Sequence, residues 1–481
     1  MRKQDFLKLK NDPVVRAVYF SAKECGSDAY LVGGVVRNVI SKLPIGCDYD
    51  FALTGNIKNI AERFASLANG SPFLLDKEIS SFRVAVKKGD TKINVDLSPL
   101  KGGNIIADIF ARDFTVNAMA IDLRELFEKD KVLLIDPLAG ARHSKKRLLA
   151  PVKDDIFNND PVRLLRAVRL SAQYGFSINK DTETLIKARA HLLKTSSWER
   201  IRDEFFATII CHNASDNLKK LYALGLLQEI FPEIIDWDRL ENYDLMSHII
   251  KAVQEGERII CGITEIIPKY EDVILRHFDG LIGNIPRSAF FKFAMFLHDV
   301  GKAVAIKIDG ERMRFPGHEM EGEAIAKKTA KRLKLSRKAS VILCKLIRNH
   351  HRVFNMASME KVSSRSKAHF FRIMDEDGID LLFMSLADAR ATRGGEDLEL
   401  AELVKEVVSF YFDVYAVKKP PSLFKGNDVM NIFNIPEGIM VGKILEKIQD
   451  AEGIGLIKNK KDAVEFINKW LLDKSKKPVL S

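Results

Sequence analysis

LVGGVVRNVISKLPIGCDYDFAL, residues 31–53, decides the fold of the first part of the chain. It joins a β-rich run, a glycine pair, a helical stretch and a second β-rich run that carries Asp48 and Asp50. Because successive side chains of a strand point to opposite faces, the two aspartates project from the same face. Two unpaired carboxylates side by side are costly, whereas Mg²⁺ favours oxygen ligands of this kind. The stretch therefore predicts a metal site, with two exposed aspartates beside a loop as the alternative.

The glycine pair, Gly33 and Gly34, lies where the predicted strand ends and the helix begins. Glycine allows close backbone approach, and the free N–H groups of a helix N-terminus attract phosphate, so a triphosphate could bind here. A Walker-type GxxxxGK[ST] pattern is absent from the sequence, and a tight turn also explains two glycines. Further on, INVDLS places Asp96 between apolar residues of another β-rich run. Asp96 is a candidate third carboxylate, and a strand-end aspartate facing water is the alternative.

Length, composition and charge indicate a well-folded protein of several domains. The chain has 481 residues, 46% of them hydrophobic, and a net charge of +11 that suits a polyanionic partner. Its five cysteines include no CxxC pair, so neither a disulfide framework nor a thiolate zinc site is indicated. No apolar run has the length of a signal peptide or a membrane span. We therefore expect a cytoplasmic protein without a membrane partner.

The pattern of apolar residues changes along the chain. Short β-rich runs alternate with helical stretches up to about residue 140, and helical periodicity dominates from residue 155 onward. This predicts a multidomain fold that combines an N-terminal α/β region, with a mixed sheet and helices, and an all-α remainder.

Five segments resemble a known family in their order and spacing over about residues 25 to 230: LVGGVVRN, DYD, ARDFTVNAMAIDL (111–123), LIDPLAG (134–140) and NDPVRLLRAVRLSAQYGF (159–176). The family is that of class II tRNA nucleotidyltransferases and bacterial poly(A) polymerases. The resemblance implies that strand carboxylates hold two Mg²⁺ ions for phosphoryl transfer to the 3′ end of an RNA. By resemblance Asp48 and Asp50 bind the metal, and together with Asp96 they are the candidate catalytic residues.

The resemblance also implies nucleotide-binding residues. ARDFTVNAMA matches the family's RRDFT-type motif, although Ala111 replaces one arginine. A polar cap ahead of an apolar helix, with Asp113 as the N-cap, also fits this stretch. The residues expected to bind nucleotide are Gly33, Gly34, Arg37, Arg112, Asp113, Asn117, Asp160, Arg163, Arg166 and Arg169.

The last four of these residues recur every three positions, which predicts that they share one helical face. An Asp/Arg pair accepts and donates, so it complements a base edge with an exocyclic amine beside an unprotonated ring nitrogen. Cytosine and adenine present that edge, whereas uracil and guanine present the reverse. The protein itself could therefore select CTP and ATP, as the resemblance implies. Asn159 stands where relatives commonly have Glu, and a solvated basic stripe is the alternative.

A second group of candidate ligands lies in the C-terminal half. FLHDVGKA, residues 296–303, places a histidine and an aspartate side by side, and other segments supply further imidazoles and one more carboxylate. The candidates are His248, His298, Asp299, His318, His350, His351 and Asp388. Five of these seven are histidines, although the chain has only ten, and imidazole with carboxylate is ordinary transition-metal ligation.

This second group resembles the HD phosphohydrolase superfamily. Its four defining positions correspond to His248, His298, Asp299 and Asp388. His318 and one of the neighbouring pair at 350 and 351 could bind a second metal. A degenerate helical domain kept as an RNA-binding scaffold is the alternative.

The two resemblances together predict four domains: a nucleotidyltransferase head at 1–150, a helical neck at 151–235, an HD domain at 236–395 and an RNA-binding tail at 396–481. The predicted function is addition of CMP and AMP to the 3′ end of tRNA, together with phosphohydrolase activity at the HD site. The basic surface would bind the tRNA backbone. Addition restricted to A or to CC, and poly(A) synthesis, are alternatives in the same class. An HD phosphohydrolase with a nucleotide-sensing head, or a non-catalytic RNA-binding protein, would belong to other classes.

Overall fold

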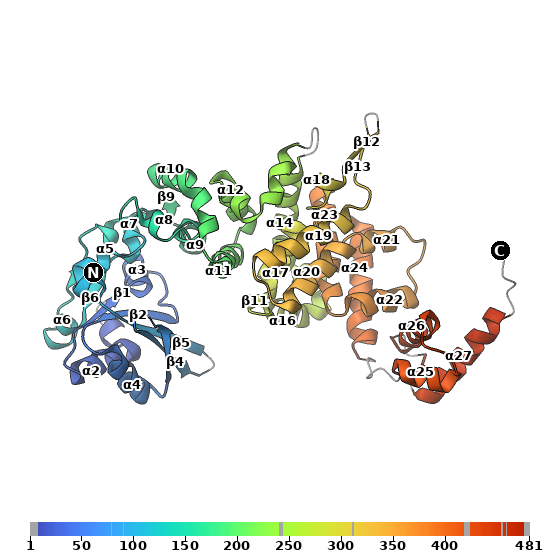
Figure 1. Ribbon diagram of the computed structural model, residues 1–481, viewed down its shortest axis with the longest axis horizontal. Helices are drawn as coiled ribbons and strands as arrows, with labels where there is room; N and C mark the ends of the chain where they lie inside the picture. Colours follow the sequence, from blue (N-terminus) through green and yellow to red (C-terminus); the bar gives the residue numbers. More distant parts are fainter. Residues whose placement is uncertain are drawn as a thin grey trace. The chain divides into compact units, whose positions relative to one another are not determined.

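The computed structural model describes residues 8–475 except positions 78, 90, 240–243, 310–311, 418–423, 454–455 and 458. The chain divides into two compact units (Figure 1). One comprises Met1–Glu204 and Lys220–Ile230, and the other comprises Phe205–Lys219 and Phe231–Ser481. The finer division into four domains stays a prediction. Among the described helices, none has both the length and the apolar content needed to cross a lipid bilayer.

A seven-stranded mixed sheet forms the core of the first unit, which confirms the predicted α/β region. The strand order is β3-β4-β5-β2-β1-β6-β7. β2 and β5 run parallel, and the other neighbours run antiparallel. The strands are β1 (Ala29–Val32), β2 (Asp48–Leu53), β3 (Ser71–Asp76), β4 (Ser81–Lys88), β5 (Thr91–Pro99), β6 (Ala120–Asp122) and β7 (Leu134–Ile135).

Helices pack on this sheet through their apolar stripes. They are α2 (Pro13–Glu24), α3 (Gly34–Ser41), α4 (Ile57–Ala68), α5 (Ile105–Phe110), α6 (Leu123–Glu128) and α7 (Gly140–Lys146). Phe51 of β2 and Phe64 of α4 are almost fully buried in the shared core. The alternative of an apolar helix behind Asp113 is wrong, because Thr115–Asn117 makes only a 3₁₀ turn before the chain enters β6. A backbone that joins a sheet cannot continue as a helix.

The segment after the sheet is mainly helical. Its elements are β8 (Leu148–Leu149), α8 (Ile156–Asn159), α9 (Arg163–Tyr174), β9 (Ser177–Ile178), α10 (Lys180–Arg189), α11 (Trp198–Ile209), α12 (Ala214–Ala223) and α13 (Leu226–Ile230). The prediction that Asp160 shares a helical face with the three arginines is wrong, because Asp160 lies between α8 and α9 with extended φ. The residue before a proline avoids helical conformation, and Pro161 follows Asp160.

The second unit is built almost entirely from helices. Its larger helices are α14 (Leu245–Cys261), α16 (Glu271–Asp279), α17 (Arg287–Leu297), α19 (His318–Arg332), α20 (Arg337–Asn349), α22 (Ser364–Met374), α23 (Asp377–Arg393) and α24 (Leu398–Phe410). Short elements include α18 (Lys302–Ala305), α21 (Arg352–Ala357) and the hairpins β10-β11 (Leu281–Ile282, Ile285–Pro286) and β12-β13 (Lys307–Asp309, Arg312–Arg314). α17 and α23 are buried along nearly their whole length and form the centre of the unit.

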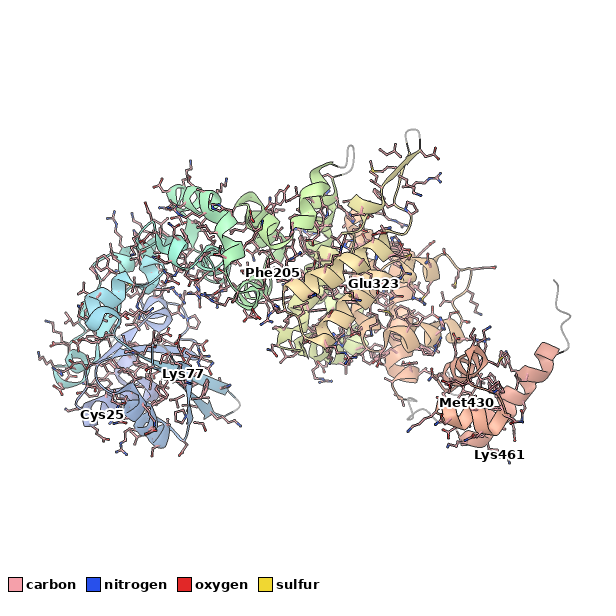
Figure 2. All side chains as sticks on the ribbon, viewed as in Figure 1. Cys25, Lys77, Phe205, Glu323, Met430 and Lys461 are labelled. Atoms are coloured by element: carbon pink, nitrogen blue, oxygen red, sulfur yellow. The ribbon has the colours of Figure 1, made fainter. Side chains whose placement is uncertain are left out.

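Aromatic packing supports this centre. Phe205, labelled in Figure 2, contacts Phe231 and Phe293 with ring centroids 5.1 and 5.9 Å away. The C-terminal helices α25 (Gly426–Phe433), α26 (Ile439–Gly453) and α27 (Lys460–Ser475) share a separate apolar cluster that includes Val429 and Ile444. The all-α remainder is thus confirmed, with helices whose apolar faces meet in more than one cluster.

Candidate functional sites

Three carboxylates lie on the two parallel strands of the sheet. The register places Asp50 of β2 opposite Asp96 of β5, and Asp48 lies two residues before Asp50 on the same face. Asp96 accepts two bonds from Arg83, at 2.6 and 2.7 Å, whereas Asp48 accepts one bond of 2.9 Å from the Asn94 amide. Asp96 is therefore committed to a guanidinium, and the oxygens of the other two aspartates are the ones left for a metal.

The electrostatics of Asp50 fit a bound cation. Burial raises the pKa of this carboxyl, and the nearby Asp96 and Asp48 raise it further, while Arg112 opposes them. A buried carboxylate beside like charges is stabilised in its charged form when a divalent ion binds. The residues present therefore fit a metal held by Asp48 and Asp50.

Gly33 brings the start of α3 close to this carboxylate pair. Its φ is +71°, and a Cβ at this position would lie 2.6 Å from the Asp50 Oδ2 atom. Both observations require glycine. The turn places the N-terminus of α3 beside the carboxylates, where the Gly34 N–H donates to Asp50 and the positive end of the helix favours a phosphate.

A cleft of about 380 Å³ opens next to these groups within the first unit. It brings together many residues that are far apart in sequence. Those of the predicted set that line it are Gly33, Gly34, Arg37, Asp48, Asp50, Arg112, Asp113, Asn117, Arg166 and Arg169. The lining does not include Asp96, Asp160 or Arg163.

A chain of polar contacts runs along the wall of the cleft. The buried Arg37 donates to the Asn117 Oδ1 atom over 2.7 Å and stacks 3.9 Å above the Tyr174 ring. Asn117 donates to Asp113, whose other oxygen accepts from Arg166 at 3.2 Å. Burial by itself raises the pKa of Asp113, but Arg166 and the Phe114 N–H hold it below its usual value. The Asp113 carboxylate thus stays charged and orients Arg166.

Glu204 is a positioning residue that the sequence analysis missed. Its two oxygens accept from the Nε atoms of Arg166 and Arg169, at 3.0 and 2.6 Å. Glu204 lies on α11, well beyond the segment that carries the arginines, and no spacing rule links the two. The pairing fixes both guanidiniums at the edge of the cleft.

Asp160 and Arg163 lie side by side, with Asp160 Oδ2 and Arg163 Nε 3.6 Å apart. Arg200 donates to the same Asp160 oxygen over 2.8 Å. The remaining Asp160 Oδ1 and the Arg163 Nε atom are buried, and neither has a hydrogen-bond partner among the described residues. The pair therefore offers one acceptor and one donor for a ligand.

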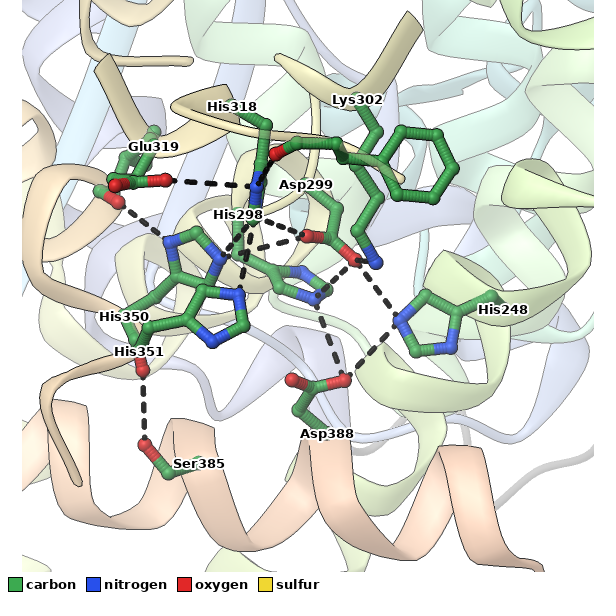
Figure 3. A network of polar contacts seen from close by, with 12 residues as sticks. His248, His298, Asp299, Lys302, His318, Glu319, His350, His351, Ser385 and Asp388 are labelled. Atoms are coloured by element: carbon green, nitrogen blue, oxygen red, sulfur yellow. Dashed lines mark hydrogen bonds and ion pairs between the residues drawn. The ribbon is translucent and has the colours of Figure 1, made fainter. Parts of the chain in front are cut away.

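The second unit gathers the predicted HD residues into one cluster (Figure 3). His248 Nε2 lies 3.2 Å from both Asp299 Oδ2 and Asp388 Oδ1. His298 Nε2 lies 3.2 and 3.6 Å from the same two atoms. These four side chains place one ligand atom each within 4.8 Å of the others, as a single metal ion requires.

A second ligand group shares Asp299. Its Oδ1 atom lies 3.5 Å from the Nε2 atoms of His318 and His350. His318 Nε2 is also 3.1 Å from the Nε2 atoms of both His350 and His351. Both members of the 350/351 pair therefore belong to the group, and Asp299 is common to the two groups. This arrangement suits two metal ions bridged by one carboxylate.

The imidazoles are oriented by the backbone. The Nδ1 atoms of His298, His318 and His350 lie 2.7 to 2.8 Å from the carbonyl oxygens of residues 295, 315 and 347. A proton on Nδ1 that is donated to a carbonyl leaves Nε2 as a metal-ligating lone pair. The cluster thus has the tautomers and the inward-facing atoms that a metal site needs.

Charge is unequally distributed over the cluster. Burial alone lowers the pKa of His298, but Asp299 and Asp388 raise it to about 10. Burial and the neighbouring His350 and His318 lower the pKa of His351 to about 4. The first group therefore has excess negative charge, which a cation neutralises. Lys302, which the sequence analysis did not single out, lies 2.6 Å from Asp299 Oδ2.

Known families match both regions. Residues 29–150 match the family described as "Poly A polymerase head domain", and residues 282–393 match the "HD domain". Residues 175–238 match the "Probable RNA and SrmB- binding site of polymerase A". The segment from Asp160 to Arg169 lies between the head-domain match, which ends at residue 150, and the RNA-binding match, which begins at residue 175.

Relatives match over nearly the whole chain. An A-adding tRNA nucleotidyltransferase from Deinococcus radiodurans is 28% identical over 92% of this chain and 95% of its own length. A CC-adding tRNA nucleotidyltransferase from Thermus thermophilus is 27% identical over 92% and 94%. A solved CCA-adding enzyme with CTP has the same fold, with a TM-score of 0.65 at 20% identity over 97% of this chain and 98% of that one.

The chain resembles the class II tRNA nucleotidyltransferase and bacterial poly(A) polymerase family in its head domain, its RNA-binding region and its nearly full-length relatives. Both resemblances drawn from the sequence, that to the nucleotidyltransferases and that to the HD superfamily, are confirmed. Nucleotidyltransferases of this family generally use divalent metal ions, and the structure provides carboxylate and imidazole groups that could hold them.

Proposed function

We propose that the protein adds C and A nucleotides to the 3′ end of tRNA without a nucleic-acid template, using two Mg²⁺ ions at Asp48 and Asp50. The cleft carries this proposal, because it joins that carboxylate pair to the fixed guanidiniums of Arg166 and Arg169. A triphosphate needs both a metal site and cations along its phosphates. The free cysteines and the absence of a disulfide among the described residues are in keeping with a cytoplasmic enzyme.

Mg²⁺ held by Asp48 and Asp50 would supply Lewis acidity at the phosphates and would lower the pKa of the attacking hydroxyl. The protein side chains orient the reactants. Asp48 and Asp50 hold the ions, and the N-terminus of α3 faces the phosphates. Arg166 and Arg169, already oriented by Glu204, place their remaining N–H groups toward the triphosphate.

Selection of the base is assigned to Asp160 and Arg163. The unpartnered Asp160 Oδ1 accepts from the exocyclic amine of cytosine or adenine, and the Arg163 Nε atom donates to the adjacent ring nitrogen. Uracil and guanine present the reverse edge. Their carbonyl oxygen, an acceptor, would face the accepting Asp160 oxygen, and their ring N–H, a donor, would face the donating Arg163 Nε atom, which leaves buried polar atoms unsatisfied. Arg200 orients Asp160, so it supplies an ordering contact in a segment where Asn159 replaces the usual Glu.

Addition restricted to A or to CC is the second candidate. It is favoured by the names of the relatives that match nearly the full length, which are A-adding and CC-adding proteins. Three tRNA substrates, ending before CCA, after the first C and after CC, separate the possibilities when each receives CTP, ATP or both. Growth to CCA only with both nucleotides supports the full reaction. Growth limited to the CC-ending tRNA, or stopping after CC, supports a partial one, and no extension of any substrate refutes the transferase proposal.

We further infer that the HD cluster is a phosphohydrolase site for two transition-metal ions. The shared Asp299 and the three backbone-oriented imidazoles carry this inference. Metal analysis of the purified protein, followed by phosphate release from nucleotides with Mn²⁺ or Ni²⁺, tests it. Near-stoichiometric metal together with hydrolysis that Asp388→Asn abolishes is the expected result. Metal-free protein that stays inactive in all metals refutes it.

A further inference from the structure

A pocket of about 610 Å³ adjoins the HD cluster in the second unit. His351 and Glu319 form part of its wall, and His351 also belongs to the second ligand group. Figure 3 shows both side chains on the side of the cluster opposite His248. The volume is typical of a small-molecule pocket. A molecule bound here therefore reaches the metal-ligand group from one side.

The pocket wall has more positive than negative groups. Its cations are Arg348, Arg352, Arg365 and Lys447, and its carboxylates are Glu319 and Glu446. Glu446 already accepts a bond of 2.7 Å from Arg372, so its charge is largely compensated. The four cations come from α20, α21, α22 and α26, so packing of four helices creates the positive surface.

Two of these arginines have N–H donors without a hydrogen-bonded carboxylate among the described residues. Arg352 is partly buried and donates from Nε to the neutral Asn349 amide over 3.1 Å, and no carboxylate of the described chain lies within ion-pair distance. Arg348 Nε lies 3.7 Å from a Glu323 oxygen, but its Nη1 atom is buried and has no hydrogen-bond partner among the described residues. An anionic ligand would satisfy these donors.

We propose that this pocket binds the second phosphate group of a nucleotide whose first phosphate is hydrolysed at the HD metals. The proposal rests on the phosphohydrolase function inferred above. Metal ions held by the two ligand groups would activate the water. The water oxygen would bond to the phosphorus, the P–O bond to the leaving oxygen would break, and that oxygen would take up a proton from the water. The other phosphate stays between Arg348 and Arg352, and Met356, Met359 and Phe370 offer an apolar surface for the base. The preferred substrates are nucleotides with at least two phosphates, on separate hydroxyls or in one chain.

The test uses the full-length protein loaded with Mn²⁺ and three substrates: AMP, adenosine 3′,5′-bisphosphate and ADP. We expect kcat/KM for adenosine 3′,5′-bisphosphate or ADP to exceed that for AMP at least tenfold. If the bisphosphate is the better substrate, the two phosphates are on separate hydroxyls; if ADP is, they are in one chain. Arg352→Gln and Arg348→Gln should each lower this ratio about tenfold, because each variant loses one charge-assisted hydrogen bond to the second phosphate. Arg365→Gln, at an exposed position, should lower it without affecting folding. Arg258→Gln is the control, since Arg258 is exposed and pairs with Glu255 on its own helix.

Loss of activity on all three substrates in equal proportion, or no change in the ratio, overturns the pocket assignment. A wild-type protein that hydrolyses no nucleotide in any metal refutes the phosphohydrolase function instead. In that case calorimetry with adenosine 3′,5′-bisphosphate still decides about the pocket. Binding at least tenfold tighter than AMP, and weakened in Arg352→Gln, supports it, and equal binding of the two nucleotides refutes it.

Discussion

Glu204→Gln tests whether the arginines of the cleft must be held in place before the nucleotide binds. The Glu204 carboxylate accepts from Arg166 and Arg169 at 3.0 and 2.6 Å, and its side chain is 12% exposed. Glutamine has nearly the same shape, but it keeps one acceptor oxygen and loses the charge. At least one of the two arginines therefore loses its contact with residue 204, although Arg166 keeps Asp113 and Arg169 keeps Gln173.

The size of the effect follows from side-chain entropy. A fully released arginine carries about 2 kcal/mol of rotamer entropy, and this is the upper limit of what the nucleotide must remove on binding, because Asp113 and Gln173 still hold one N–H group of each arginine. This corresponds to a rise in KM of up to about 30-fold. Because neither arginine belongs to the Asp160–Arg163 pair, CTP and ATP should be affected alike. The maximal rate should change less than KM, since the metal ligands are intact.

The assay is nucleotide incorporation into tRNA lacking its 3′ end, with tRNA saturating and one nucleotide varied. Thermal unfolding confirms that the variant is folded at the assay temperature. Glu229→Gln is the matched control, because Glu229 pairs with the more exposed Lys194 at 2.7 Å in the same unit. Such a pair contributes little, about 0 to 1 kcal/mol. An unchanged KM for Glu204→Gln would refute the inference that Glu204 positions the two arginines. A lower KM would also refute it, and would show that Glu204 competes with the nucleotide for them.

Three further outcomes are expected. Asp50→Asn should reduce nucleotide transfer about a thousandfold, equivalent to about 4 kcal/mol of metal-dependent stabilisation, and leave hydrolysis at the HD site intact; loss of both activities would contradict this. Asp299→Asn should remove metal from both HD groups, and a variant that retains one metal ion would contradict the shared role of Asp299. Chelation of the wild-type protein should lower its Tm by about 5 to 11 °C, because a ligand at 100 times its Kd adds about 2.7 kcal/mol to the free energy of unfolding. Asp380→Asn should cost about 3 to 5 kcal/mol at pH 7 in urea unfolding. Burial raises the pKa of Asp380, but His277 and Arg287 hold it below the usual 3.8, so its contribution is complete above that pH and fades as pH falls below it; a stability gap that persists far below pH 3.8 would contradict this.

Local patterns were sufficient for several features of the sites. The alternation of DYD places Asp48 and Asp50 on one face of a strand, and the structure has them so. The glycine pair marks the turn into α3, where a positive φ and the approach to Asp50 both exclude a side chain. Such features depend on neighbours along the chain, so the sequence reports them directly.

Other features depended on partners far along the chain. The three-residue spacing from Asp160 to Arg169 suggested one helix. Pro161 excludes Asp160 from that helix, so α9 begins only at Arg163 and carries the three arginines alone. No spacing indicated that Glu204 would meet Arg166, because that contact follows from the packing of α11 against α9.

The HD cluster shows the same division. The sequence by itself determined which imidazoles and carboxylates are available, because the chemistry of a ligand lies in its residue type. Only the tertiary structure decided that Asp299 serves two groups and that both His350 and His351 belong to the second. Helices α14, α17, α19, α20 and α23 bring these atoms together, and the packing of their apolar faces has no signature in the spacing of the ligands themselves.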